Sequence, residues 1–281
     1  NGLGTNDASQ NSPDHASIAV PLNAERIEIL RGPATLLYGS GAIGGVVNVI
    51  DNRIPEKVPE TGGSVEQKYN TATTSRQTAL KFEGGASKFA YHFDGYFQEN
   101  DDINISGNAV DATRAQVSQS GLTVDANTNG FVNNSAAHNT SLTVGGSFVG
   151  DSGFFGVSGN MVEMDYQIPT RGEAGGEASF INMEQRKLDV KGGLNNLDGF
   201  FKKINTKLSL TDYEHNEAHE ALFQNDTFEG RVDATHKPIF GMDGVMGFQM
   251  ISSYFSALEV EEGEYINPKT RTNSYAAFLQ E

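Results

Sequence analysis

Residues 88–98, KFAYHFDGYFQ, alternate between two kinds of side chain along the whole segment. One face carries Phe89, Tyr91, Phe93, Gly95 and Phe97, and the other carries Lys88, His92, Asp94, Tyr96 and Gln98. This period of two predicts a β-strand with one apolar and one polar face. A tilted strand of about 9–11 residues can cross a bilayer, so the segment fits a membrane-spanning strand whose His92 and Asp94 line an interior.

The same alternation recurs from residue 62 onward and predicts about ten strands. We expect them at 62–70, 76–84, 88–98, 138–149, 153–164, 183–195, 203–213, 227–237, 245–257 and 272–281. Tight turns are expected at 85–87 and 150–152. Long polar connections are expected at 99–137, which reads as a mobile surface loop, and at 165–182, 214–226 and 258–271. Short turns at one rim and long loops at the other are typical of a transmembrane antiparallel β-barrel.

The composition excludes several classes of protein. The 281 residues have a mean hydropathy of −0.42 and no apolar run near ~18 residues, so no membrane-spanning helix is expected. The absence of Cys excludes disulfide scaffolds and thiolate metal sites. The net charge of −16 argues against a nucleic-acid partner. The 32 glycines favour turns and close backbone contacts over helices.

Residues 24–50, AERIEILRGPATLLYGSGAIGGVVNVI, form a different and mixed unit. The pattern predicts a strand at 24–31, a break at 32–33, a short turn or helical piece at 35–39, a small-residue loop at 40–45 and a β-branched strand at 46–50. A compact α/β unit therefore precedes the long alternating strands.

This unit resembles the end of the plug domain of TonB-dependent outer-membrane receptors. The resemblance rests on ERIEILRGP (25–33), YG (38–39) and GAIGGVVNVI (41–50), which follow each other almost without gaps. It implies the C-terminal part of an α/β plug at 1–55 and the N-terminal part of a β-barrel at 56–281. Because plugged barrels have about 22 strands, about ten strands amount to part of one, and we expect a mostly β fragment.

The resemblance also implies a function. Such a receptor lies in the outer membrane of a Gram-negative bacterium, in contact with lipid, and binds a scarce ligand outside the cell. The TonB energy-coupling complex of the inner membrane then displaces the plug, acting through an N-terminal box that precedes this region in the family. No reaction is catalysed and no resident cofactor is required.

Several later segments resemble the zinc-uptake branch of these receptors. They are SPDHA (12–16), FINMEQ (180–185), YEH (213–215), EGRV (229–232) with His236, and FSAL (255–258). In that branch a plug Asp-His pair and barrel carboxylates hold the metal, which implies Asp14, His15, Glu261 and Glu262 as ligands. The alternative for the two glutamates is a charged, solvated rim.

The segment EHNEAHE, residues 214–220, adds His215 and His219. In an extended chain these two residues share a side with Glu217, and in a helix they converge at i and i+4. Neutral His is a common metal ligand, and zinc takes about four N or O ligands where thiolates are absent. The segment predicts metal capture in an extracellular loop, with a plain solvated loop as the alternative.

Other functions stay open from the sequence. An iron-siderophore or haem receptor shares the same plug and barrel. A soluble β-rich binding or adhesion module would bury Phe89, Phe93, Leu208 and Leu210 in a protein core, whereas a barrel would turn them to lipid. A hydrolase is disfavoured, because no Ser/His/Asp or paired-carboxylate arrangement with enzymatic spacing stands out.

Overall fold

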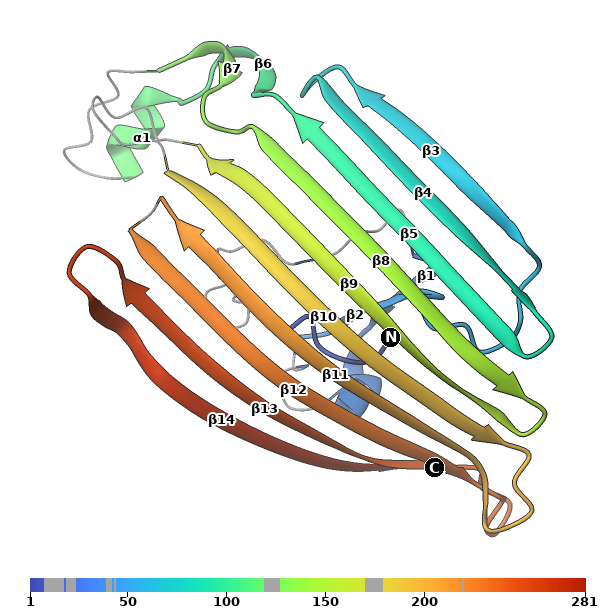
Figure 1. The fold of residues 1–281 in the computed structure, drawn as a ribbon. Helices are drawn as coiled ribbons and strands as arrows, with labels where there is room; N and C mark the ends of the chain where they lie inside the picture. The colour runs from blue at the N-terminus through green and yellow to red at the C-terminus, as the bar shows by residue number, and fades with distance from the viewer. Residues whose placement is uncertain are drawn as a thin grey trace.

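The dominant element is one antiparallel sheet of ten strands (Figure 1). The computed structural model describes residues 1–7, 18, 24–38, 42, 44–118, 127–169, 179–218 and 220–281. The sheet is formed by β3 (Gly62–Asn70), β4 (Ser75–Ala86), β5 (Phe89–Asn100), β8 (Ala137–Gly150), β9 (Gly153–Ile168), β10 (Ser179–Asn195), β11 (Phe201–Glu217), β12 (Ala221–His236), β13 (Val245–Glu259) and β14 (Glu264–Gln280). Each pairs with the next in the list, so all ten expected strands are confirmed.

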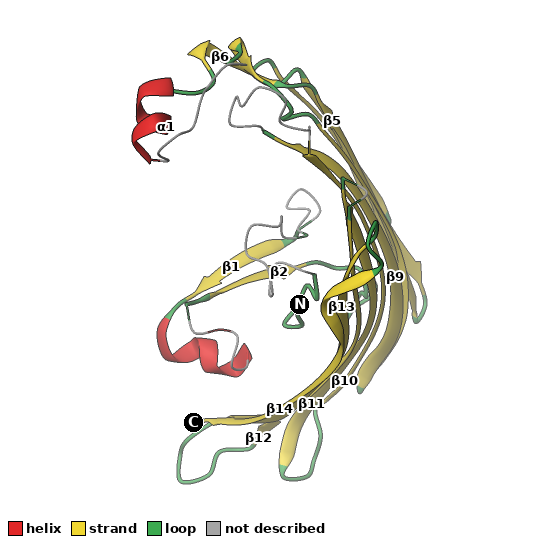
Figure 2. Ribbon diagram, turned by 90° about the vertical axis from the view of Figure 1, so that its left-hand side faces the viewer, coloured by secondary structure: helices red, strands yellow, loops and turns green. Residues whose placement is uncertain are grey.

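The sheet curves into a trough that encloses a small second unit (Figure 2). This unit is a hairpin of β1 (Arg26–Leu30) and β2 (Val46–Ile50), joined in part by a 3₁₀ helix, η3 (Gly32–Tyr38). The mixed unit expected at 24–50 is therefore confirmed, and the fold is mostly β with the curvature of a partial barrel. Among the described helices, none is long and apolar enough to span a bilayer.

The two faces of the sheet carry opposite chemistry. On the convex face, the exposed fraction is 66% for Phe89, 37% for Leu208 and 53% for Leu210. On the concave face, Asp94 and Thr143 are fully buried. A soluble β protein buries its apolar face instead. The module interpretation is thus wrong for these residues, and the sheet has the apolar-out, polar-in arrangement of a membrane barrel.

The apolar surface on the convex face ends at a sharp level. On β10, Leu194, Gly192, Val190 and Leu188 precede Arg186 and Glu184. On β9, Phe155, Val157, Gly159 and Met161 precede Glu163 and Asp165. Four alternate positions correspond to about 20–23 Å of strand, which is the scale of the apolar band of a membrane barrel, about 25 Å.

The expected loop lengths are partly wrong. Strands β11 and β12 leave only 218–220 between them, and β13 and β14 leave only 260–263. The segment 99–137 is not a plain loop, because it contains β6 (Ile103–Asn108), α1 (Ala112–Ser118) and β7 (Asn129–Val132), which extend beyond one end of the sheet (Figure 1). Beyond the bilayer both strand faces are polar, so the alternation disappears although the hydrogen-bond ladder continues.

Glycines allow the linker after β2 to lie directly on the concave face. A Cβ atom at Gly145 on β8 would overlap the carbonyl oxygen of Arg53, and one at Gly156 on β9 would crowd the Ile54 side chain. Next to them, Ser147 Oγ donates to the carbonyl oxygen of Pro55 at 2.5 Å. Part of the high glycine content therefore serves this close approach of backbone to backbone.

The boundary of the apolar band can be tested with Leu208→Arg and Asp212→Arg, both on the convex face of β11. We expect Leu208→Arg to lower the free energy of unfolding in lipid vesicles by about 2–4 kcal/mol, because the cation enters the middle of the bilayer. Asp212→Arg lies at the edge of the band and is expected to cost about 0–1 kcal/mol. Equal costs in urea titrations of the two vesicle-embedded variants would contradict the assignment of the faces.

Candidate functional site

The first residues of the chain lie on the concave face and are held there by barrel side chains. Each contact pairs a side chain of β10, β11 or β12 with a plug carbonyl oxygen. They are Gln185 Nε2 to Thr5 at 2.9 Å, Lys187 Nζ to Gly4 at 2.9 Å, Lys207 Nζ to Asn1 at 2.7 Å and Asn225 Nδ2 to Asn6 at 3.1 Å. The inner wall thus supplies the donors that a neighbouring strand would otherwise give to this extended segment.

A buried carboxylate, Glu229 on β12, anchors the same segment from the acceptor side. Its Oε2 accepts from the Gly4 amide at 2.9 Å and from Asn6 Nδ2 at 3.4 Å. Its Oε1 accepts from Gln249 Nε2 at 2.6 Å. A fully buried carboxylate needs such donors to offset the loss of water, so the plug is part of what keeps Glu229 stable.

Arg231, also on β12, holds the other side of the plug. Its Nη1 donates to the Leu37 carbonyl oxygen at 2.5 Å. The guanidinium lies 5.8 Å from the ring centre of Tyr38 on the plug and 4.6 Å from that of Phe278 on the barrel. Nε also pairs with Asp233 at 3.4 Å. The residue therefore links plug and wall by both hydrogen bonding and cation–π contact.

The junction between plug and barrel is fixed by a chain of polar side chains. Arg53 Nε pairs with Asp94 at 3.1 Å, and Asp94 lies 3.0 Å from His92 Nε2. His92 Nδ1 in turn lies 3.3 Å from Glu83, which also accepts from Asn52 Nδ2 at 3.0 Å. His92 and Asp94 therefore line the interior as expected, and they tie the linker to β4 and β5.

Glu56 extends this attachment to β10, where its Oε1 lies 2.5 Å from Lys191 Nζ. Burial by itself would raise the pKa of Glu56, but the hydrogen bond and the charge of Lys191 outweigh burial and bring the pKa below its ordinary value of 4.5. The carboxylate is thus ionised, and paired, at neutral pH.

His215 lies in the wall and not in a loop, which corrects the expected placement. It belongs to β11, is fully buried, and its Nδ1 is hydrogen-bonded to the Tyr213 hydroxyl at 2.8 Å. Its ring stacks on Phe223 at 4.4 Å, and Nε2 lies 3.6 Å from Glu217. The extended alternative, with His215 and Glu217 on one side, is the one observed, because β11 continues to residue 217.

The other expected metal ligands are not brought to His215 by the described residues. Asp14, His15 and His219 lie outside the described residues. Glu261 and Glu262 are exposed in the turn between β13 and β14. Within the part of the chain that the structure describes, no three His, Cys, Asp or Glu side chains converge as a metal site would require. The ligand set therefore stays a prediction.

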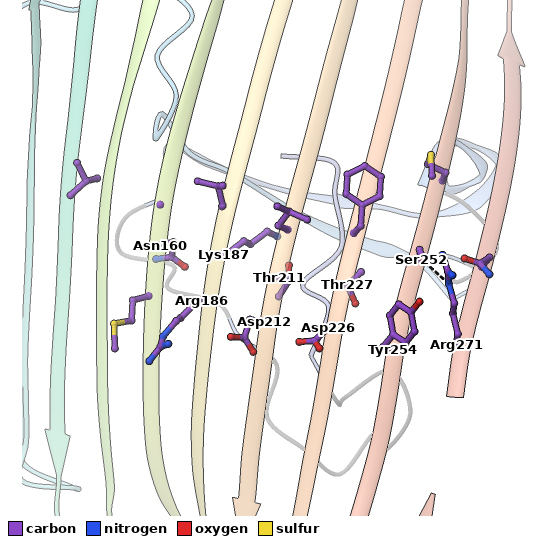
Figure 3. A pocket seen from close by; sticks show the side chains of 18 of the residues that line it. Asn160, Arg186, Lys187, Thr211, Asp212, Asp226, Thr227, Ser252, Tyr254 and Arg271 are labelled. Atoms are coloured by element: carbon purple, nitrogen blue, oxygen red, sulfur yellow. Dashed lines mark hydrogen bonds between the residues drawn. The ribbon is translucent and has the colours of Figure 1, made fainter. Parts of the chain in front are cut away.

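A groove of about 860 Å³ runs over the convex face between β8 and β14 (Figure 3). The charged and aromatic side chains across it are Arg186, Asp212, Asp226, Tyr254 and Arg271. Arg271 Nε donates to Ser252 Oγ at 3.3 Å, and its guanidinium lies 5.0 Å from the ring centre of Tyr254. Because this surface belongs to the apolar face, the groove faces the bilayer and lies off any path through the interior.

Comparison with known proteins identifies both parts of the fold. Residues 1–46 match the TonB-dependent receptor plug domain family. The ferric enterobactin receptor PirA of Pseudomonas aeruginosa is 35% identical over 111 residues, which are 36% of this chain and 15% of that protein. The iron-regulated outer membrane virulence protein of Vibrio cholerae is 41% identical over 70 residues, 23% of this chain and 10% of that protein.

The solved structure of the copper transporter OprC covers 99% of this chain with a TM-score of 0.73 and 16% identity, and the chain covers 43% of that structure. These matches support a TonB-dependent receptor. The chain spans only a small part of its curated relatives and less than half of this structure. The receptor lies in the outer membrane of a Gram-negative bacterium. No branch within the family is singled out, so the zinc-uptake resemblance stays a prediction.

The plug anchor at Glu229 can be tested with Glu229→Gln in the complete receptor. The neutral amide keeps the shape but loses the charge-assisted bonds and turns a donor toward the plug. We expect a local cost of ~1.5–3 kcal/mol and about ten- to hundredfold faster hydrogen exchange of the Gly4 amide. Asp226→Asn, on the convex face of the same strand, is the control. Unchanged exchange at Gly4 in Glu229→Gln would contradict the anchor.

The ion pair of Glu56 gives a pH prediction. Because its folded pKa is lowered, the pair contributes stability above the ordinary pKa of 4.5, and this contribution is lost as the pH falls through the folded value. Lys191→Met removes the stabilising partner and leaves the burial, so the pKa of Glu56 is expected to rise. Carbon-13 NMR titration of the Glu56 carboxyl measures it. A pKa that stays low in Lys191→Met would refute this cause.

Proposed function

We propose that the receptor takes up a scarce metal or metal chelate across the outer membrane, with the plug displaced by the TonB complex to admit it. The observation that carries the proposal is the plug seat, in which barrel side chains bond to plug backbone along β10, β11 and β12. No resident cofactor and no catalysed reaction are needed for this task. The metal is the cargo.

The polar seat suits a plug that must move. A typical hydrogen bond contributes only about 0.5–1.5 kcal/mol net, because water replaces it when it breaks. An apolar seat would instead cost about 25 cal/mol for every Å² exposed on release. A plug held by polar side chains is therefore stable at rest and can be drawn away by an external pull without exposing a large apolar surface.

Zinc is the ion that the sequence favours, through Asp14, His15, Glu261 and Glu262 together with His215 and His219. Imidazole and carboxylate groups suit zinc where thiolates are absent. A ferric siderophore is an alternative of equal standing, because the relatives matched by sequence include a ferric enterobactin receptor. A haem receptor remains a further alternative, with the same plug and barrel.

Ligand titration of the complete receptor separates these alternatives. We expect zinc affinity to fall at least tenfold in Asp14→Ala/His15→Ala if the plug pair binds the ion, since each lost ligand removes a coordination bond. Asp151→Ala, in the exposed turn between β8 and β9, is the control. If zinc affinity is unchanged while ferric enterobactin binds, the cargo is the siderophore. Binding of neither, with no TonB-dependent uptake, would remove the proposed function.

A further inference from the structure

Three cations of the inner wall lie side by side on neighbouring strands. In the strand register, Lys191 of β10 is directly opposite Lys207 of β11, and Lys207 is directly opposite Arg231 of β12. Lys207 feels the like charges of both neighbours. Like charges directly opposite each other destabilise a sheet. The cationic row formed by Lys191, Lys207 and Arg231 therefore needs compensation from elsewhere.

Most of this compensation comes from the plug and its linker. Lys191 pairs with Glu56 of the linker at 2.5 Å, Lys207 donates to the Asn1 carbonyl oxygen at 2.7 Å, and Arg231 donates to that of Leu37 at 2.5 Å. Within the wall, Arg231 also has Asp233 at 3.4 Å. Four residues before Lys191 on the same face, Lys187 donates to the Gly4 carbonyl oxygen. Displacing the plug would remove a partner from every member of the row.

The wall around the row stays positive when all its ionisable groups are considered. The concave face of β10 to β12 at this depth carries the cations Lys187, Lys191, Lys203, Lys207 and Arg231 and the carboxylates Asp189, Glu229 and Asp233. This excess of cations contrasts with the net charge of −16 of the whole chain. The positive patch is thus a local feature of the inner wall.

The depth of the row strengthens its effect. Lys207 is adjacent in the chain to Leu208, whose side chain lies in the apolar band on the opposite face. Low-dielectric walls on either side concentrate the field of buried charges. A bare divalent cation moving along this wall would be repelled, whereas an anion would replace the contacts that the departing plug withdraws.

Resting on the function proposed above, we propose that the cargo passes the cationic row as an anion, namely a metal chelate of net negative charge, and not as a free divalent cation. The ligand class is a metal held by catecholate or carboxylate oxygens whose charge exceeds that of the metal. Side-chain ammonium and guanidinium groups recognise such oxygens by charge-assisted hydrogen bonds. The row then serves twice, first as a seat for plug carbonyls and afterwards as a track for the chelate.

The test uses the complete receptor in TonB-competent cells and three radiolabelled probes. These are an anionic ferric catecholate, a neutral ferric trihydroxamate and zinc chloride. The variant Lys191→Gln/Lys207→Gln/Arg231→Gln keeps donors for the plug but removes the charges. Lys191→Arg/Lys207→Arg/Arg231→Lys keeps the charges. Arg186→Gln, a cation on the convex face of β10, is the matched control.

We expect the wild type to transport the ferric catecholate in preference to the other two probes. Uptake of the ferric catecholate should fall at least tenfold in the glutamine variant, with its binding to de-energised cells unchanged. It should stay near wild type in the charge-preserving variant and in Arg186→Gln. A purely structural role for the row would change plug retention and binding together, so this split separates passage from seating.

Several outcomes would overturn the inference. Undiminished catecholate uptake in the glutamine variant would do so, as would equal loss in the charge-preserving variant. TonB-dependent uptake of zinc or of the neutral chelate in preference to the catecholate would overturn it while leaving metal uptake as the function. Uptake of none of the probes by the wild type would remove the proposed function itself, and the inference with it.

Discussion

Apolar side chains on one face of every long strand and polar ones on the other are the constraint on which the rest of the structure depends. Because the bilayer cannot hydrogen-bond, the convex face must be apolar, and the concave face is left to polar groups. Leu210 and Thr211, adjacent in the chain, show the contrast, since Leu210 is exposed and Thr211 is buried. The low mean hydropathy then follows from averaging a lipid face, a polar interior and polar strand ends.

The plug can only be held as it is because the interior is polar. Side chains of β10, β11 and β12 bond to plug backbone, and glycines at 145 and 156 let the linker approach the sheet. The same requirement places Lys191, Lys207 and Arg231 opposite one another, a row that is tolerable while the plug covers it. Seat and row are two consequences of one polar surface, and together they connect the fold to movement of a charged cargo.

The strands and the orientation of their faces could be predicted from the sequence, because a period of two is written directly in residue chemistry. The hairpin at 24–50 could be predicted for the same reason and by its resemblance to known plugs. The outer ends of the strands could not, since β11 continues past Tyr213 with polar residues on both faces. His215 was therefore expected in a loop. Glu229 as a plug anchor had no local signal, because it meets Gly4 across 225 positions of the chain.

Site-directed spin labelling along β11 tests the face assignment most directly. The chain has no Cys, so each introduced cysteine carries the only label. In the complete receptor in lipid vesicles, labels at Leu208 and Leu210 should collide strongly with oxygen dissolved in the bilayer, and labels at Ser209 and Thr211 should be shielded from it. An alternation of this kind is the result the structure requires. Uniform accessibility along the strand, or the opposite alternation, would contradict it.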